Sequence, residues 1–90
     1  MQEEACLTLE QLCGACTVGP DWVAGHVLEG RLHPPGERPS QWRFGSRDVA
    51  RVTRIRQLEI AFDADPELAA LVADLMEQLE DLRTQLRLLD

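Results

Sequence analysis

Cys13 and Cys16, two cysteines separated by two residues, are the side chains of this sequence whose type and spacing could do chemistry. Such a pair can cycle between dithiol and disulfide, or it can bind a metal ion together with further ligands. A redox pair needs its first thiol at a helix N-terminus, where the helix dipole stabilises the thiolate. Thr8 and Gln11 have the spacing of a capping box, which predicts a helix that begins at Leu9. Both thiols then lie near the C-terminal end of this helix, where the dipole opposes thiolate formation.

A metal site is also not expected. A structural zinc ion needs four ligands, and beside the pair only Cys6, His26 and His33 remain, with a histidine spacing outside the usual finger patterns. We therefore predict no metal and no cofactor. The two thiols are interpreted as small hydrophobic side chains on the buried face of the first helix. The apolar face of this helix recurs with helical spacing at Leu9, Leu12, Cys13 and Cys16.

The charges are sorted along the chain. The 90 residues carry a net charge of -7, and every basic residue other than the two histidines is an arginine. Most arginines lie between residues 31 and 56, whereas residues 1–30 and 57–90 are acidic. An acidic protein disfavours indiscriminate binding to nucleic acid or to anionic membranes, and it favours encounter with a basic partner.

Size and residue types argue against an enzyme. A chain this short buries only about 60–65% of the surface of its unfolded state, so a roomy catalytic cleft is not expected. The sequence shows no nucleophile–base pair, no phosphate-binding glycine loop and no paired carboxylates in a recognisable catalytic setting.

A cytoplasmic location is expected. No apolar run approaches the roughly 20 residues of a membrane span. Glu3 and Glu4 stand where a signal peptide would need positive charge. Three cysteines, an odd number, are typical of reduced thiols rather than of a disulfide framework.

Two short helices joined by a tight turn are predicted at the start of the chain. The second begins at Pro20, which suits a first helical position, and ends before Gly30. The pair has the pattern of a helix-turn-helix unit. Residues 31–44 are rich in proline and end in an alternating Trp42-Arg43-Phe44, which predicts a two-stranded β-hairpin, or wing.

A third helix is expected from Ser46, which can act as its N-cap. Apolar residues follow every three to four positions, at Val49, Val52, Ile55 and Leu58 or Phe62. Arginines form a neighbouring stripe on this helix. The residues that we predict in the core are Trp22, Val49, Val52, Ile55, Leu68 and Leu75.

The clearest pattern lies in the last third of the chain. Asp65 is a predicted N-cap, and Pro66 suits the first turn of the helix that follows. Its apolar residues alternate spacings of four and three, as in a coiled-coil seam: Leu68, Val72, Leu75, Leu79, Leu82, Leu86 and Leu89. Leu71 and Met76 widen the apolar face in the first half only, which indicates that this half lies on the core and the second half extends beyond it. The residues predicted to form a helix–helix contact, in a homodimer, are Leu79, Leu82, Leu86 and Leu89.

Two alternatives to a specific protein partner remain open. A DNA-reading helix-turn-helix presents basic or amide side chains on its second helix, but here that helix carries Asp21 and Glu29 instead. A DNA-binding surface would have to come from Arg43, Arg47, Arg51 and Arg54. We favour pairing of these arginines with the acids of the first and fourth helices, because the same acids would repel phosphates. A purely structural dimerisation module is the second alternative.

The sequence resembles two families. Its similarity to MerR-like winged helix-turn-helix domains rests on EGRLHP (29–34), WRF (42–44) and SRDVARV (46–52), with Ile55 and Leu58, and covers about residues 7–62. The plan of nearly the whole chain is more similar to that of the CbpM chaperone modulators. That similarity rests on LTLE (7–10), Trp42-x-Phe44, the arginine-bearing third helix, the link from Leu58 to Asp65, and the leucine-rich terminal helix.

Pattern and resemblance together predict an all-α fold. Residues 1–62 would form a MerR-like winged helix-turn-helix domain with a small β-hairpin wing, and residues 63–90 a long C-terminal helix. The resemblance implies a non-enzymatic protein that binds the J-domain of a DnaJ-like, CbpA-type co-chaperone and inhibits it. J-domains engage their Hsp70 through a basic helix, which acidic side chains could cover by charge complementarity. The acids that we expect on the outer face of the terminal helix and just before it are Asp63, Asp65, Glu67, Asp74, Glu77 and Asp81.

Overall fold

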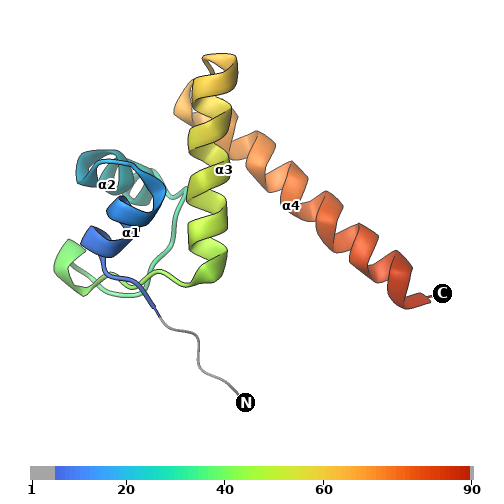
Figure 1. The fold of residues 1–90 in the computed structure, drawn as a ribbon, viewed down its shortest axis with the longest axis horizontal. Helices are drawn as coiled ribbons and strands as arrows, with labels where there is room; N and C mark the ends of the chain where they lie inside the picture. The colour runs from blue at the N-terminus through green and yellow to red at the C-terminus, as the bar shows by residue number, and fades with distance from the viewer. Residues whose placement is uncertain (1–5, 90) are drawn as a thin grey trace.

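Four α-helices make up most of the protein. The computed structural model describes residues 6–89. The elements are α1 (Leu9–Cys16), α2 (Pro20–Leu28), the 3-10 helix η1 (Pro39–Gln41), α3 (Ser46–Phe62) and α4 (Pro66–Leu89). Helices α1 and α2 lie against one side of α3, and α4 turns back from the end of α3 and diverges from it (Figure 1). The all-α prediction is confirmed.

The ends of the first two helices follow local sequence signals. The Thr8 hydroxyl accepts a hydrogen bond from the Gln11 amide at 3.2 Å, and the Gln11 side chain accepts one from the Thr8 amide at 2.9 Å. This is the predicted capping box. Helix α2 begins at Pro20, as predicted, and Gly30 follows its end with a φ of 78°.

Helix α3 begins at Ser46, but the N-cap is Gly45. The Gly45 amide donates to a carboxylate oxygen of Asp48 at 2.9 Å. The acid in the first turn therefore stabilises this helix end, rather than a Ser46 cap as predicted.

The predicted β-hairpin wing is wrong: residues 31–45 form a loop with one turn of 3-10 helix, and residues 6–89 contain no named strand. Phe44 instead pairs with Leu7, in an isolated bridge with N···O distances of 2.8 and 2.9 Å. The prolines of the loop lack the amide hydrogens that a ladder needs. Gly36 is required at its turn, because its φ is 111° and a Cβ atom would lie 2.7 Å from the Gln41 carbonyl oxygen.

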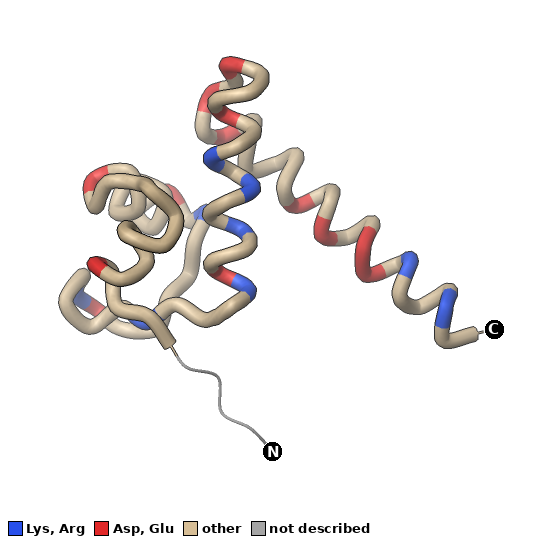
Figure 2. Tube along the Cα trace, viewed as in Figure 1, with Lys and Arg blue, Asp and Glu red and all other residues tan. Residues whose placement is uncertain are grey.

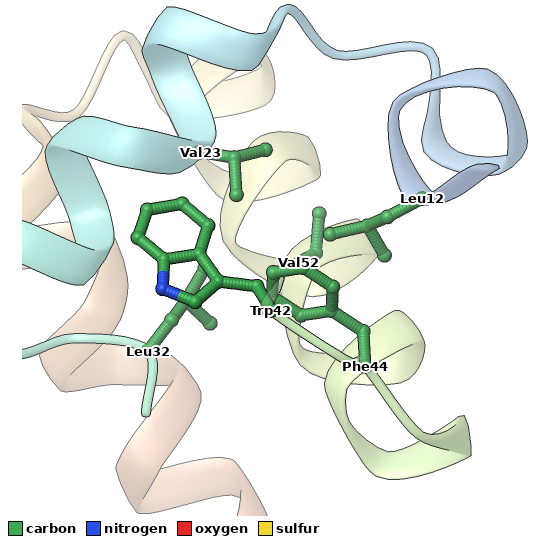
Figure 3. Packing of buried hydrophobic residues seen from close by; sticks show 6 residues of the cluster. All are labelled: Leu12, Val23, Leu32, Trp42, Phe44 and Val52. Atoms are coloured by element: carbon green, nitrogen blue, oxygen red, sulfur yellow. The ribbon is translucent and has the colours of Figure 1, made fainter. Parts of the chain in front are cut away.

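The first hydrophobic core joins α1, α2, α3 and the loop (Figure 3). Trp42 and Phe44 both point into it, which explains why this extended segment pairs with Leu7 and not with a wing strand. Cys13 and Cys16 are half-buried against the same core, as their interpretation as small hydrophobic residues predicted. The buried members of this core are Leu12, Val23, Leu32, Trp42, Phe44 and Val52.

A second, smaller core joins α3 to α4. Ile55 of α3 contacts a cluster of small α4 side chains, which are Ala69, Ala70 and Ala73. Of the predicted core residues, Val52 and Ile55 are fully buried, and Trp22 and Val49 are half-buried. The prediction is wrong for Leu68 and Leu75, which are 49% and 56% exposed. The contact uses alanines because small side chains allow the two helices to approach closely.

Helix α3 ends at Phe62, and Asp63 closes it in the left-handed conformation. The predicted division between residues 62 and 63 thus falls at the turn between α3 and α4. The division of the chain into two domains stays a prediction.

A candidate protein-interaction surface on the last two helices

The side of α4 that faces away from the domain carries a stripe of leucines. Each residue turns an α-helix by about 100°, so the heptad positions lie opposite the buried alanines. The leucines of this stripe are between 49% and 82% exposed, and no described residue covers them: Leu68, Leu71, Leu75, Leu79, Leu82, Leu86 and Leu89. We call this set the leucine stripe. Met76 is exposed as well. The first half of α4 lies on the core and the second half extends beyond it, as predicted, but the contact is made by the alanines and not by Leu71 and Met76.

The side of α4 that faces α3, away from the leucine stripe, is held to α3 by ion pairs. The Arg51 guanidinium lies 2.6 Å from Asp74 and 3.2 Å from Glu77, and that of Arg54 lies 3.0 Å from Glu80. The hydrogen bond from Arg54 lowers the pKa of the Glu80 carboxyl and raises the pKa of the arginine. Figure 2 shows basic segments along α3 across from acidic segments in the middle of α4.

These contacts place the acids of the predicted ridge differently from the prediction. Asp74 and Glu77 face α3, not the outer side of α4, which the leucines occupy. Asp63 and Asp65 lie in the turn, where the Asp65 carboxylate accepts a hydrogen bond from the Leu68 amide at 2.9 Å and caps α4. The six acids therefore do not form one outward ridge.

Within residues 6–89, the side chains of three of the six predicted acids, Asp63, Glu67 and Asp81, hold no hydrogen bond or ion pair. Glu67 lies beside a shallow depression between the end of α2 and the start of α4, which Glu29 and Arg31 also line. Asp81 lines a larger groove between α3 and α4. The helical turn places Glu67, Asp74 and Asp81 on nearly the same flank of α4, seven residues apart.

The groove between α3 and α4 has a volume of about 350 Å³. We call it the α3–α4 groove. One wall consists of α3 residues with their arginines, and the other of acidic α4 residues. The lining residues are Arg47, Asp48, Ala50, Arg51, Arg54, Glu77, Glu80 and Asp81.

The arginines of the DNA-binding alternative are only partly available. Arg51 and Arg54 are held by acids of α4, and Arg51 also donates to the Arg31 carbonyl at 3.0 Å. Arg43 donates to the Trp42 carbonyl at 2.7 Å, and Arg47 makes no ion pair. The expected pairing of arginines with acids of the terminal helix is thus confirmed for Arg51 and Arg54.

Sequence reasoning missed a buried polar network around His26. Its Nδ1 accepts a hydrogen bond from Arg31 Nε at 2.8 Å, so its Nε2 carries the hydrogen that points to Glu59, at 3.2 Å. Trp22 and Arg56 donate to the other oxygen of Glu59, at 2.9 and 3.3 Å. Burial, together with nearby arginines, lowers the pKa of the His26 imidazole against the opposing effect of Glu59. The i, i+4 spacing of Trp22 and His26 was visible in the sequence, but their shared acceptor Glu59, 37 and 33 residues away, was not.

Known proteins show a clear relationship. The chain is 30% identical to a protein named chaperone modulatory protein CbpM from Pseudomonas entomophila (strain L48), over 88% of this chain and 78% of the relative. This chain belongs to the CbpM family. Proteins of the same name from Pseudomonas putida strains W619 and GB-1 are 25% and 27% identical over the same shares. No protein-family model matches the chain, and no solved structure shows a significant match.

The described part of this CbpM-family chain presents an open groove and an exposed apolar stripe. Within residues 6–89, no three potential metal ligands of the His, Cys, Asp or Glu type lie together. In that same range, no helix is long and apolar enough to cross a membrane. Burial raises the pKa of the Cys13 thiol, and Cys16 and Glu10 raise it further, which disfavours the reactive thiolate.

Proposed function

We propose that this CbpM-family protein modulates a chaperone by binding the J-domain of a DnaJ-like, CbpA-type co-chaperone and inhibiting it. The role is non-enzymatic and belongs to the cytoplasm. The relatives support it because all three are named chaperone modulatory proteins. The structural observation that supports it best is the acidic flank of α4, which borders an open groove.

The acidic flank suits a basic helix such as the one through which J-domains engage their Hsp70. Asp74 and Glu77 remain 49% and 41% exposed although Arg51 contacts both. Glu67 and Asp81 lie along the same flank without a cation, and Asp63 and Asp65 extend the negative charge to the turn. Charge complementarity of this kind mainly raises the association rate and the specificity, and salt weakens it.

A calorimetric titration with the isolated J-domain tests this proposal. We expect saturable binding that weakens with salt. The triple variant D74N/E77Q/D81N should bind about tenfold more weakly at low salt, since three negative charges are removed from the flank that borders the groove. The matched control is E10Q/D21N/E37Q, which loses three acids elsewhere and should bind within about twofold of the original protein.

Equal affinity of the two triple variants would contradict the acidic-flank contact. The absence of any complex at about 100 μM protein would exclude affinities tighter than about -5 to -6 kcal/mol and overturn the function itself. Inhibition is measured separately, as loss of co-chaperone-stimulated ATPase activity of the Hsp70.

We also propose that a second copy of the chain covers the leucine stripe. The spacing of four and three over residues 68–89 is that of a two-helix seam, and every leucine of the seam faces solvent in the single chain. The flanking polar positions of the second half are Gln78, Arg83 and Gln85, so no acidic pair opposes association there.

The alternative function is that of a MerR-like transcriptional regulator that binds DNA. The observation in its favour is that Arg43 and Arg47, in the loop and at the start of α3, form no ion pair with any acid of residues 6–89. It predicts an affinity for DNA that falls steeply with salt, and at least one preferred sequence. Fluorescence anisotropy with labelled duplexes at 50 and 200 mM salt tests it.

A further inference from the structure

Two arginines of α3 bridge the α3–α4 groove with internal ion pairs. Arg51 bridges it to Asp74 and Glu77. Arg54, which lies nearer the end of α3, bridges it to Glu80. Beyond these pairs the helices diverge, and Arg47 and Asp81 line the groove on opposite walls (Figure 1).

Among the described residues, the side chains of Arg47 and Asp81 make no hydrogen bond or ion pair, unlike those of Arg51 and Arg54. Both side chains are exposed. Ala50 lies among the lining residues and adds little bulk, so the wall between the arginines of α3 is open. The groove therefore offers a cation on one wall, an anion on the other and free space between them.

We propose that the α3–α4 groove is the docking site for one helix of the partner J-domain, which rests on the proposed function. A groove of about 350 Å³ accepts several side chains from one face of a helix, not a whole domain. The occupant must carry a basic residue on the side that meets Asp81 and an acidic residue on the side that meets Arg47. This opposed pair of charges fixes the direction in which the helix lies, because the reversed helix would bring like charges together.

The groove and the leucine stripe lie on different sides of α4. Buried alanines and ion-paired acids occupy the side toward α3, while the leucines point away from it. A second copy bound through the leucine stripe thus leaves the α3–α4 groove of each chain open. A dimer binds two J-domains, one for each chain.

Single charge reversals in the full chain distinguish binding at this groove from a general effect of the net charge of the protein. R47D is compared with R38D, since both arginines are exposed, neither forms an ion pair, and both changes lower the net charge equally. If only the overall negative charge attracts the basic partner, both variants bind the J-domain more tightly. If the groove is the site, R47D binds about fivefold or more weakly and R38D does not.

The charge swap R47D/D81R is the sharpest variant, because it leaves the net charge of the chain unchanged. We expect at least tenfold weaker binding in a calorimetric titration at low salt, with helix content unchanged in circular dichroism. Binding equal to that of the original protein would overturn the groove assignment. If R47D/D81R loses helix content, the single variant R47D decides. Unchanged affinity of R47D for the J-domain would then overturn the groove assignment as well.

The independence of the two sides of α4 is tested with L79Q/L86Q. This variant should still bind one J-domain per chain with affinity within about twofold, even where it no longer self-associates. Loss of J-domain binding in this variant would show that the leucine stripe, not the groove, holds the partner. If the original protein itself fails to bind the J-domain, the proposed function falls and the docking site with it, an outcome distinct from all those above.

Discussion

His26 is 2% exposed and lies in a network of charged groups from three parts of the chain. Glu59 faces it from α3 and Arg31 from the loop, Arg56 of α3 pairs with Glu59, and Arg51 acts on it from α3 at longer range. The neutral imidazole satisfies this arrangement, with one nitrogen accepting from Arg31 and the other donating to Glu59. Protonation would place a hydrogen on the nitrogen that faces the Arg31 donor, so the folded protein resists it.

The stability of the fold should therefore depend on pH through His26. Since its pKa is lowered in the folded state, the unfolded chain binds the proton more readily below the ordinary pKa of about 6.5. The free energy of unfolding then falls as the pH drops from 7 through 6.5, by at most about 1.4 kcal/mol per pH unit for one group, until the folded-state pKa is reached. Urea unfolding from pH 5 to 7.5 measures this slope.

H26Q is the comparison for that slope, because glutamine keeps a donor and an acceptor but does not titrate. The difference in stability between the original protein and H26Q should change with pH only below about pH 7. A difference that stays constant from pH 5 to 7.5 would mean that His26 has the same pKa in the folded and unfolded chain.

At the scale of elements, α4 has two unlike sides. Its first half contacts α3 through Ala69, Ala70 and Ala73, and its ion pairs to α3 are partly exposed. Exposed ion pairs stabilise a fold only weakly, typically by less than about 1 kcal/mol each. The alanine contact is therefore the stronger determinant of how α4 sits on α3.

A73L should destabilise the fold by about 1–3 kcal/mol, because Ala73 is fully buried between two helices and has no space for a larger side chain. A61L is the matched control, since it is the same substitution at an exposed position of α3. It should alter stability by less than about 0.5 kcal/mol. Chemical denaturation of both variants gives the two values, and equal destabilisation would contradict the tight α3–α4 contact.

The whole molecule is an open V rather than a closed bundle. Its extents are 44 × 39 × 20 Å, and α4, with 24 residues, is about 36 Å long. All residues from 78 to 89 are exposed, and within residues 6–89 the ion pair between Glu80 and Arg54 is the one that holds this half of α4 to α3. An isolated helix of this length is marginal in water, which favours a partner along the leucine stripe.

Sedimentation equilibrium should show a species of twice the chain mass for the original protein. L79Q/L86Q should be a monomer, because it places two amides in the centre of the proposed seam. L88Q is the matched control, since Leu88 is exposed but lies off the stripe, and it should remain a dimer. A single-chain mass for the original protein at about 100 μM would overturn the dimer.

Local sequence signals predict the four helices of this protein but not the loop between α2 and α3. The capping box at Thr8, the proline at the start of α2 and the heptad spacing of α4 are local signals, and neighbours along the chain are sufficient to produce them. The tertiary structure decided which side of each element is buried. Periodicity marked the leucines of α4 as apolar, but the close approach of α3 selected the alanines, and the arginines of α3 turned Asp74 and Glu77 inward. The loop likewise forms no hairpin because Trp42 and Phe44 are buried in the core, and no local sequence pattern predicts such long-range contacts.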